Sequence, residues 1–131
     1  MNDCESIENA LISALSGNAL TDRIIRQDDG LWQVFLGSEL VTVEVDAASR
    51  RVNFSIESLD AFSELSSEKL ILLLQYSFVW QANGGVYFSL TDNNQPVLMI
   101  YFNIDEIDDS MVRNVVLGLL EKFLMWKDIL L

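Results

Sequence analysis

The segment VLMIYF, residues 97–102, limits most strongly what this chain can fold into. Every position in it is apolar, whereas a strand with one face toward water alternates between apolar and polar side chains. A shorter strand-like run, residues 86–90, precedes it across the polar turn TDNNQP, so the two segments predict a hairpin. Both faces of this hairpin need a cover, and a chain of 131 residues has little material with which to sandwich a sheet.

Helical spacing occurs at the start of the chain. Residues 3–15 predict a short amphipathic helix, with Gly17 as the residue that ends it. Its apolar stripe consists of Ile7, Leu11, Ala14 and Leu15. Ile12 points away from this stripe and is an isolated apolar residue.

The hydrophobic period then changes to two, which predicts four antiparallel strands. The first two, residues 22–27 and 31–37, flank the turn DDG, where Gly30 can take a positive φ. The next two, residues 39–46 and 51–57, alternate cleanly. Their inward side chains are predicted to be Val41, Val43, Val45, Val52, Phe54 and Ile56.

A second helix is predicted from a cap at Ser66 or Ser67 to about Val79. A helix that is apolar nearly all round is buried on more than one side. Two interpretations stay open, because such a helix can lie in the centre of the core or at a subunit interface. The apolar positions are Leu70, Ile71, Leu72, Leu73, Leu74 and Phe78.

A long helix closes the chain, with acids at its start and Lys122 and Lys127 toward its end, the polarity that the helix dipole favours. The order is α-β-β-β(-β)-α-β-β-α, with the strand at residues 22–27 as the optional one. The sequence thus predicts one α+β domain, residues 1–131, of two layers with helices packed on a twisted antiparallel sheet. Two helices are expected to cover one face of the sheet.

Charge restricts the partners. Eight Lys and Arg against twenty Asp and Glu give a net charge of −12. Nucleic acids and anionic membrane surfaces are polyanions, so neither is expected as a partner. The acidity either keeps an apolar-rich chain dispersed or favours a basic or neutral polypeptide partner, and the two are compatible. Because the apolar runs are too short to span a bilayer and the acidic N-terminus is unlike a secretory signal, we expect a soluble cytosolic protein.

The sequence contains few of the residue types that usually carry out catalysis. The chain contains no histidine and one cysteine, Cys4. The usual general base is therefore missing, and one cysteine cannot make an internal disulfide or a thiolate metal site. Carboxylates, Lys or Tyr can catalyse reactions in principle, but no spacing predicts a polar pocket. We expect no catalytic residue, no metal ligand and no cofactor.

Apolar surface is the remaining candidate for a function. Leu31 and Phe35 lie on the strand face opposite the set Trp32, Val34 and Leu36, so one set faces away from the helices. Uncovered apolar patches usually mark binding surfaces, and exposed strand edges accept an added strand from a partner.

The stretch from about Lys69 to Asp128 resembles the class I type III secretion chaperones, the CesT/SycE-like family. LLLQYSFVWQANGGVYFSLTDNNQPVLMIYF is similar to that family's helix, Gly-Gly pair, short strand, polar turn and second strand. LLEKFLMWKDIL is similar to its closing helix, with a Phe-Leu pair and a terminal aromatic residue. The N-terminal half matches in layout alone.

The resemblance implies a homodimer in the bacterial cytoplasm that holds the N-terminal segment of a secreted effector polypeptide in extended form. The second face of VLMIYF would then lie against a second subunit or the bound chain. The resemblance also allows a secretion-apparatus ATPase or a co-chaperone as partners. Carried over residue by residue, the dimer interface comprises Leu70, Leu73, Leu74, Tyr76, Phe78, Val86 and Phe88, and the effector-binding residues are Ile12, Leu31, Phe35 and Leu40.

Other interpretations stay open. YbjN-like regulatory domains share this layout and need neither a second copy nor a secretion client. A subunit of the secretion apparatus is another alternative, and an enzyme would require a polar pocket around Asp, Glu, Tyr or Lys. A heterodimeric co-chaperone is an alternative to the homodimer. Which sheet face binds the effector is assigned from the alternation of side chains alone. A shift of one residue in strand register would exchange the two faces.

Overall fold

The computed structural model describes residues 3–15, 21–62 and 64–131. The helices in these ranges are α1 (Asp3–Leu15), α2 (Ser67–Phe78), the short 3-10 helix η1 (Ile104–Glu106) and α3 (Asp109–Leu130). The strands are β1 (Thr21–Asp28), β2 (Leu31–Leu36), β3 (Glu39–Asp46), β4 (Arg51–Ser58), β5 (Tyr87–Leu90) and β6 (Pro96–Asn103). The predicted order of elements is confirmed, including the optional first strand. Gly17 lies outside the described residues.

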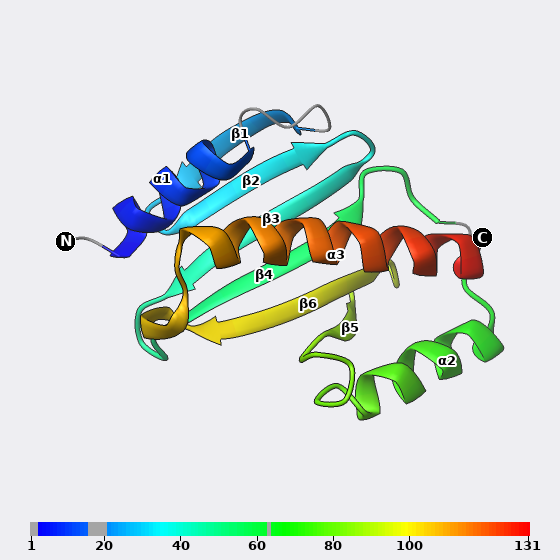
Figure 1. Cartoon of the computed structure of the whole chain (residues 1–131). Helices are drawn as coiled ribbons and strands as arrows, with labels where there is room; N and C mark the ends of the chain where they lie inside the picture. The colour runs from blue at the N-terminus through cyan, green and yellow to red at the C-terminus, as the bar shows by residue number, and fades with distance from the viewer. Residues whose placement is uncertain (1–2, 16–20, 63) are drawn as a thin grey trace.

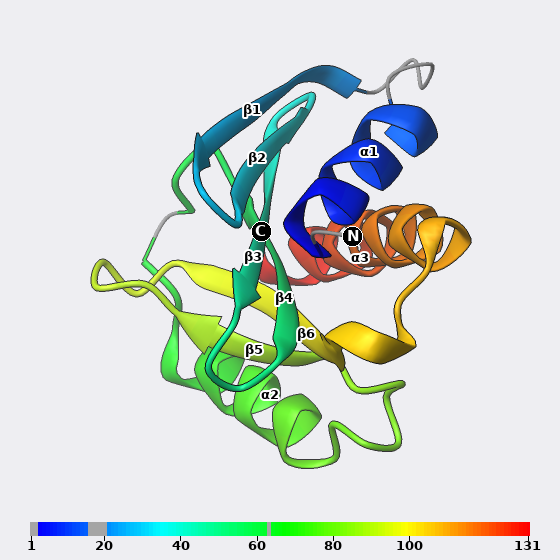
Figure 2. The same cartoon turned by 90° about the vertical axis from the view of Figure 1, so that its left-hand side faces the viewer.

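The strands form one antiparallel sheet in the order β1-β2-β3-β4-β6-β5. Helix α3 crosses one face of this sheet, and α1 packs beside it on the same side (Figure 1). The view turned by 90° shows that the opposite face carries no helix, and that α2 lies beside β5 at one end of the sheet (Figure 2). The two-layer α+β architecture is therefore as predicted.

Alternation along the strands decides which side chains enter the core. Trp32 and Val34 of β2 and Phe54 of β4 are fully buried on the face that α1 and α3 cover. Because neighbouring side chains on a strand point to opposite faces, Leu31 and Phe35 lie on the open face. Phe123 of α3 completes the core and meets the ring of Phe62 edge-on at 6.4 Å.

Local signals account for the ends of the elements. Gly30 takes a φ of 76° in the turn between β1 and β2, as expected for a hairpin. The Ser66 side chain accepts a hydrogen bond from Lys69 N and so caps α2. Pro96, which has no amide donor, opens β6. The acidic run before α3 forms η1 first, and the long helix then begins behind its cap, Asp108.

Helix α2 is not enclosed by its own chain. Leu73 is its one buried residue, at 3% exposed, whereas Leu74 and Phe78 are 70% and 86% exposed. The interpretation of this helix as a central core helix is therefore wrong. Its N-terminal end is held by Lys69 Nζ, which donates to the Leu130 carbonyl of α3 at 2.7 Å.

Candidate protein-interaction site

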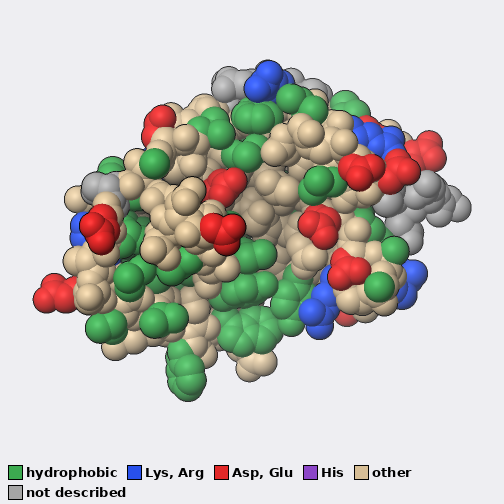
Figure 3. Space-filling model, turned by 180° about the vertical axis from the view of Figure 1, so that it is seen from behind, with side chains coloured by type: hydrophobic (Ala, Val, Ile, Leu, Met, Phe, Trp, Pro, Cys, Tyr) green, Lys and Arg blue, Asp and Glu red, His purple; other side chains and the backbone are tan. Residues whose placement is uncertain are grey.

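An exposed apolar surface runs along α2. We call its outward residues, Leu70, Ile71, Leu74, Ser77 and Phe78, the α2 face. In this set Ile71, Leu74 and Phe78 are exposed to solvent, although all three are large and apolar. Seen from the side opposite α3, hydrophobic side chains gather in the lower part of the molecule, over α2 and the β5 end of the sheet (Figure 3). Contiguous apolar surface of this kind marks an interaction site.

A hollow lies between α2 and β5. Its volume is about 370 Å³, and its walls are mostly apolar. We call it the α2–β5 hollow; it is lined by Leu70, Leu73, Leu74, Ser77, Phe88, Ser89 and Leu90. The α2 face thus continues directly into a concave apolar surface.

The Ser77 hydroxyl joins α2 to the edge of the sheet. Its Oγ accepts a hydrogen bond from Phe88 N at 2.8 Å and donates to the Leu73 carbonyl at 2.8 Å. Strand β5 pairs with β6 on one side, so the Phe88 amide points to the outer edge, where an added strand would bind. Ser77 satisfies this donor and closes the edge at that point.

An aromatic cluster covers part of the open face near β5. Trp80 meets Tyr87 at 6.3 Å and Tyr101 at 6.0 Å between ring centroids. The Arg51 guanidinium lies 4.2 Å from the centre of the Tyr101 ring, in cation–π contact. Burial raises the pKa of Tyr87, Tyr101 raises it further and Arg51 opposes the shift, so this phenol is neutral at pH 7. These rings supply part of the cover that the apolar second face of β6 required.

The residues predicted for a dimer interface divide into two groups. Leu74 and Phe78 are exposed, and Leu70, Tyr76 and Phe88 are half-buried. Leu73 and Val86 are buried, at 3% and 2% exposed, so they support this surface from beneath. The Tyr76 ring packs against Phe88 and Trp126, and burial raises the pKa of its phenol.

The residues predicted to bind an effector do not form one patch. Leu31 and Phe35 are half-buried on the open face, where Arg23 stacks over the Phe35 ring at 4.4 Å. Leu40 pairs with Phe35 across β2 and β3, but it is only 8% exposed. Ile12 is 47% exposed on α1, which packs on the other side of the sheet. Leu31 and Phe35 therefore come together, whereas Ile12 is separated from them by the sheet.

Sequence reasoning missed two components of the site. The Ser77 hydroxyl accepts a hydrogen bond from the Phe88 amide. The Trp80 ring contacts the rings of Tyr87 on β5 and Tyr101 on β6. A serine inside an apolar helix was the available signal for the first, since such residues often bond to backbone groups. The second depends on partners up to 21 residues away in the sequence, as Trp80 and Tyr101 are, and on the pairing of β5 with β6.

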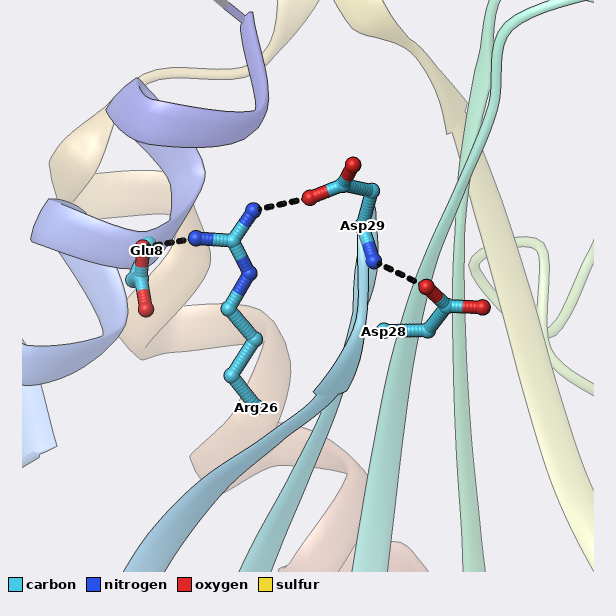
Figure 4. A network of polar contacts seen from close by, with 4 residues as sticks. All are labelled: Glu8, Arg26, Asp28 and Asp29. Carbon is cyan, nitrogen blue, oxygen red and sulfur yellow. Dashed lines mark hydrogen bonds and ion pairs between the residues drawn. The ribbon is translucent and has the colours of Figure 1, made fainter.

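The segment that forms most of this site carries few charges. Between residues 70 and 104 the sequence contains one charged residue, Asp92, although the whole chain carries −12. One group of charged contacts lies at the opposite edge of the sheet, where Arg26 of β1 bonds to Glu8 of α1 at 3.3 Å and also contacts Asp29 (Figure 4). Such exposed ion pairs contribute little stability. The α2–β5 region is therefore the nearly uncharged part of an acidic protein.

Within the residues that the structure describes, no group of three or more acidic or Cys side chains could hold a metal ion. None of the described helices has the length and apolarity needed to cross a membrane. What the fold presents is an apolar helix face with an adjoining hollow, and a sheet face without a helix. Uncovered apolar surfaces of this kind are typical of protein-interaction sites.

Comparisons with known proteins specify the fold. No family model and no curated protein sequence matches this chain. A chain in the structure of the HopA1–SchA chaperone–effector complex is 15% identical with a TM-score of 0.71, and the match covers 98% of each chain. A chain in the ExsC–ExsE complex is 13% identical with a TM-score of 0.82, and the match covers 99% of this chain and 97% of that one.

A third structure is that of the Yersinia pestis type III secretion chaperone SycH in complex with a stable fragment of YscM2. Its matching chain is 13% identical with a TM-score of 0.70, and the match covers 95% of this chain and 99% of that one. At sequence identities this low, the comparisons show a shared fold and nothing more specific. The chain has the fold of the class I type III secretion chaperones, which confirms the resemblance seen in the sequence.

Proposed function

We propose that this protein is a type III secretion chaperone, a binding protein rather than an enzyme, which holds an effector segment in extended form in the bacterial cytoplasm. The observation that carries this proposal is the chaperone fold combined with apolar surfaces that the chain does not cover itself. The three structures described above were determined as complexes, and one of them is named a chaperone–effector complex. Binding energy alone holds such a client, so no cofactor is needed.

We propose two surfaces with different partners. The α2 face and the α2–β5 hollow bind a second copy of the chain and make a homodimer. The open sheet face at Leu31 and Phe35 binds the effector segment, and Ile12 on the other side of the sheet gives an extended chain a further contact after it has passed around the sheet edge. An extended segment also suits strand addition, for which β1 is favoured because Ser77 closes the β5 edge.

The test is to purify the tagged protein from its native host and weigh the intact complexes by native mass spectrometry. Two subunits of 14.8 kDa with one additional polypeptide are expected. The bound polypeptide should be a secreted protein, and limited proteolysis should leave one protected N-terminal segment. A monomer with no client would contradict the proposal and would favour the YbjN-like regulatory domain. A secretion ATPase or a co-chaperone in place of an effector would place the protein elsewhere in the apparatus.

A further inference from the structure

Another hollow lies at the aromatic cluster. We call it the aromatic hollow; its volume is about 270 Å³, and it is lined by Ser77, Trp80, Tyr87 and Tyr101. Tyr87 of β5 is paired with Met99, and Tyr101 of β6 is paired with Asn53, at positions that alternate with buried core residues. The two tyrosines therefore belong to the sheet face that carries no helix (Figure 2).

The aromatic hollow differs from the α2–β5 hollow in what lines it. The two hollows share Ser77 and no other lining residue. The Ser77 hydroxyl is already bonded to Phe88 N and to the Leu73 carbonyl, each at 2.8 Å. The surface of the aromatic hollow therefore consists mainly of three aromatic rings, which are separate from the surface proposed for a second copy.

The polar atoms around the aromatic hollow are mostly hydrogen-bond donors. The Trp80 indole N–H can donate and cannot accept, and a neutral phenol can donate. Because burial raises the pKa of Tyr87, this phenol keeps its proton at pH 7. The Arg51 guanidinium, 4.2 Å from the centre of the Tyr101 ring, adds further donors. The hollow therefore suits a ligand that is rich in acceptors and poor in N–H groups.

Charge favours an uncharged occupant. Aromatic rings can bind a cation through their faces, but the fixed charge of Arg51 beside Tyr101 repels a second cation. Asp46 faces Arg51 across β3 and β4, and its carboxylate already accepts bonds from the amides of Ala48 and Ser49. An acidic segment is disfavoured by the net charge of −12.

Proline meets these requirements among the amino acids. It has a carbonyl acceptor and no N–H, and its apolar ring can pack on aromatic rings. A polyproline II stretch makes no internal hydrogen bonds, so its carbonyls are free to accept them, and aromatic-lined grooves are the surfaces that bind such stretches. A cavity of about 150 Å³ holds benzene, so a hollow of about 270 Å³ has room for a prolyl ring.

We propose that the aromatic hollow binds a proline of a partner polypeptide, with the neighbouring residues of that partner in a polyproline II conformation. The rings of Trp80, Tyr87 and Tyr101 hold the prolyl ring, and the indole and phenol groups donate to the carbonyls beside it. The inference rests on the proposed function only in taking an extended polypeptide as the partner. It adds which residue type this place on the open face selects.

NMR titration with acetyl-decaproline amide tests the proposal on the whole protein. The indole N–H signal of Trp80, assigned from its loss in Trp80→Phe, should shift and saturate with a dissociation constant of about 1 mM or below. The indole signals of Trp32 and Trp126, which are 0% and 8% exposed, should stay in place. A Gly-Ser peptide of equal length is the matched uncharged control, and arginine amide tests for a cation in the same hollow. Neither should shift the Trp80 signal.

Two variants test the roles of the rings and the donors. Trp80→Leu should weaken decaproline binding about tenfold or more, because it removes one wall of the hollow. Tyr101→Phe keeps the ring and loses a donor, so it should weaken binding about two- to tenfold and remains informative if Trp80→Leu fails to fold. The control is Leu72→Ala, a change at a residue of α2 that is 44% exposed and lines neither hollow. It should change the constant less than about twofold.

The outcomes separate this inference from the proposed function. If the Gly-Ser peptide shifts the Trp80 signal as much as decaproline does, or if arginine amide shifts it and decaproline does not, the proline site is wrong. If decaproline does not bind but a secreted client copurifies with the protein, the proline site is likewise wrong and the chaperone assignment stands. If decaproline binds through Trp80 and Tyr101 but no secreted client is found, the proline site holds and the proposed function fails.

Discussion

Glu39 at the start of β3 and Lys127 near the end of α3 form an ion pair across 88 residues of sequence, with Lys127 Nζ at 3.1 Å from Oε1 of Glu39. The Glu39 side chain is 6% exposed and the Lys127 side chain 20% exposed. The pair therefore joins the last turns of α3 to the sheet in a largely desolvated place. Breaking such a pair is costly because it leaves one charge buried without a partner.

We predict that Lys127→Met lowers the free energy of unfolding by about 3 kcal/mol, because it leaves the Glu39 carboxylate unpaired. The double variant with Glu39→Gln should lose less than the sum of the two single changes. Urea denaturation at one fixed protein concentration measures both effects. Lys122→Met on the same helix is the control and should stay within about 0.5 kcal/mol of the parent. Equal losses for the two lysines would contradict a specific role of the pair.

Ser77→Ala is expected to destabilise the protein by about 1–2 kcal/mol, because the Phe88 amide loses its acceptor at the sheet edge. Hydrogen exchange measured by NMR should show weaker protection of the Phe88 amide. Ser89→Ala, on an exposed residue of β5, is the control and should have little effect. If the Phe88 amide stays equally protected in the Ser77 variant, the assigned acceptor is wrong.

Two glycine-to-alanine substitutions should change the stability of the protein in opposite directions. Gly85 has a φ of 90°, where a side chain is strained, and a Cβ there would meet Ile100 at 3.6 Å. Gly85→Ala should therefore cost about 1–2 kcal/mol. Gly118 lies inside α3 and a Cβ would meet nothing within 4 Å, so Gly118→Ala should stabilise by about 0.5–1 kcal/mol. The melting temperatures of both variants test these expectations. A stabilising Gly85→Ala would contradict the claim that the positive φ of Gly85 strains a side chain.

The Asp108 carboxylate should titrate below its ordinary value. Hydrogen bonds from the Met111 amide, then from the Ser110 side chain, lower the pKa of this α3 cap below 3.8. A lowered folded-state pKa means that the cap stabilises the protein above pH 3.8 and that this contribution is lost as the pH falls through the folded-state pKa. NMR titration of the side-chain carboxyl carbon measures the value. Asp108→Asn keeps an N-cap acceptor without a charge, so its stability should depend less on pH in this range.

Phe35→Asp should weaken binding of the effector segment about tenfold or more, because it removes the aromatic ring from the proposed contact at Leu31 and Phe35. The change should leave dimerisation unaltered. Isothermal titration with the copurified segment measures the affinity, and sedimentation measures the oligomeric state. Asn53→Asp adds the same charge to the same face without removing an apolar contact, and serves as the matched control. Equal losses in the two variants would indicate a charge effect rather than an apolar contact at Phe35.

The elements themselves were predictable from the sequence, because each depends on neighbours a few residues apart. Alternation predicted β3 and β4 with six inward side chains; five of them are fully buried, and Val45 is half-buried. The Ser66 cap, the positive φ of Gly30 and the start of β6 at Pro96 are equally local signals. Parity separated Leu31 and Phe35 from Trp32, but the sheet was needed to decide which set meets the helices.

The site was predictable only in outline. The sequence indicated that α2 is too apolar for a single buried stripe, and left a core position and an interface position open. The tertiary structure excludes the core position, because α2 lies beside the edge strand β5 and leaves Phe78 in solvent. It also shows the hydrogen bond between Ser77 and the Phe88 amide, the ring contacts of Trp80 with two tyrosines, and the ion pair between Lys127 and Glu39. Hydrophobic periodicity reports the local backbone, whereas these contacts depend on the order of strands in the sheet and on where the helices dock, which spacing along the chain does not encode.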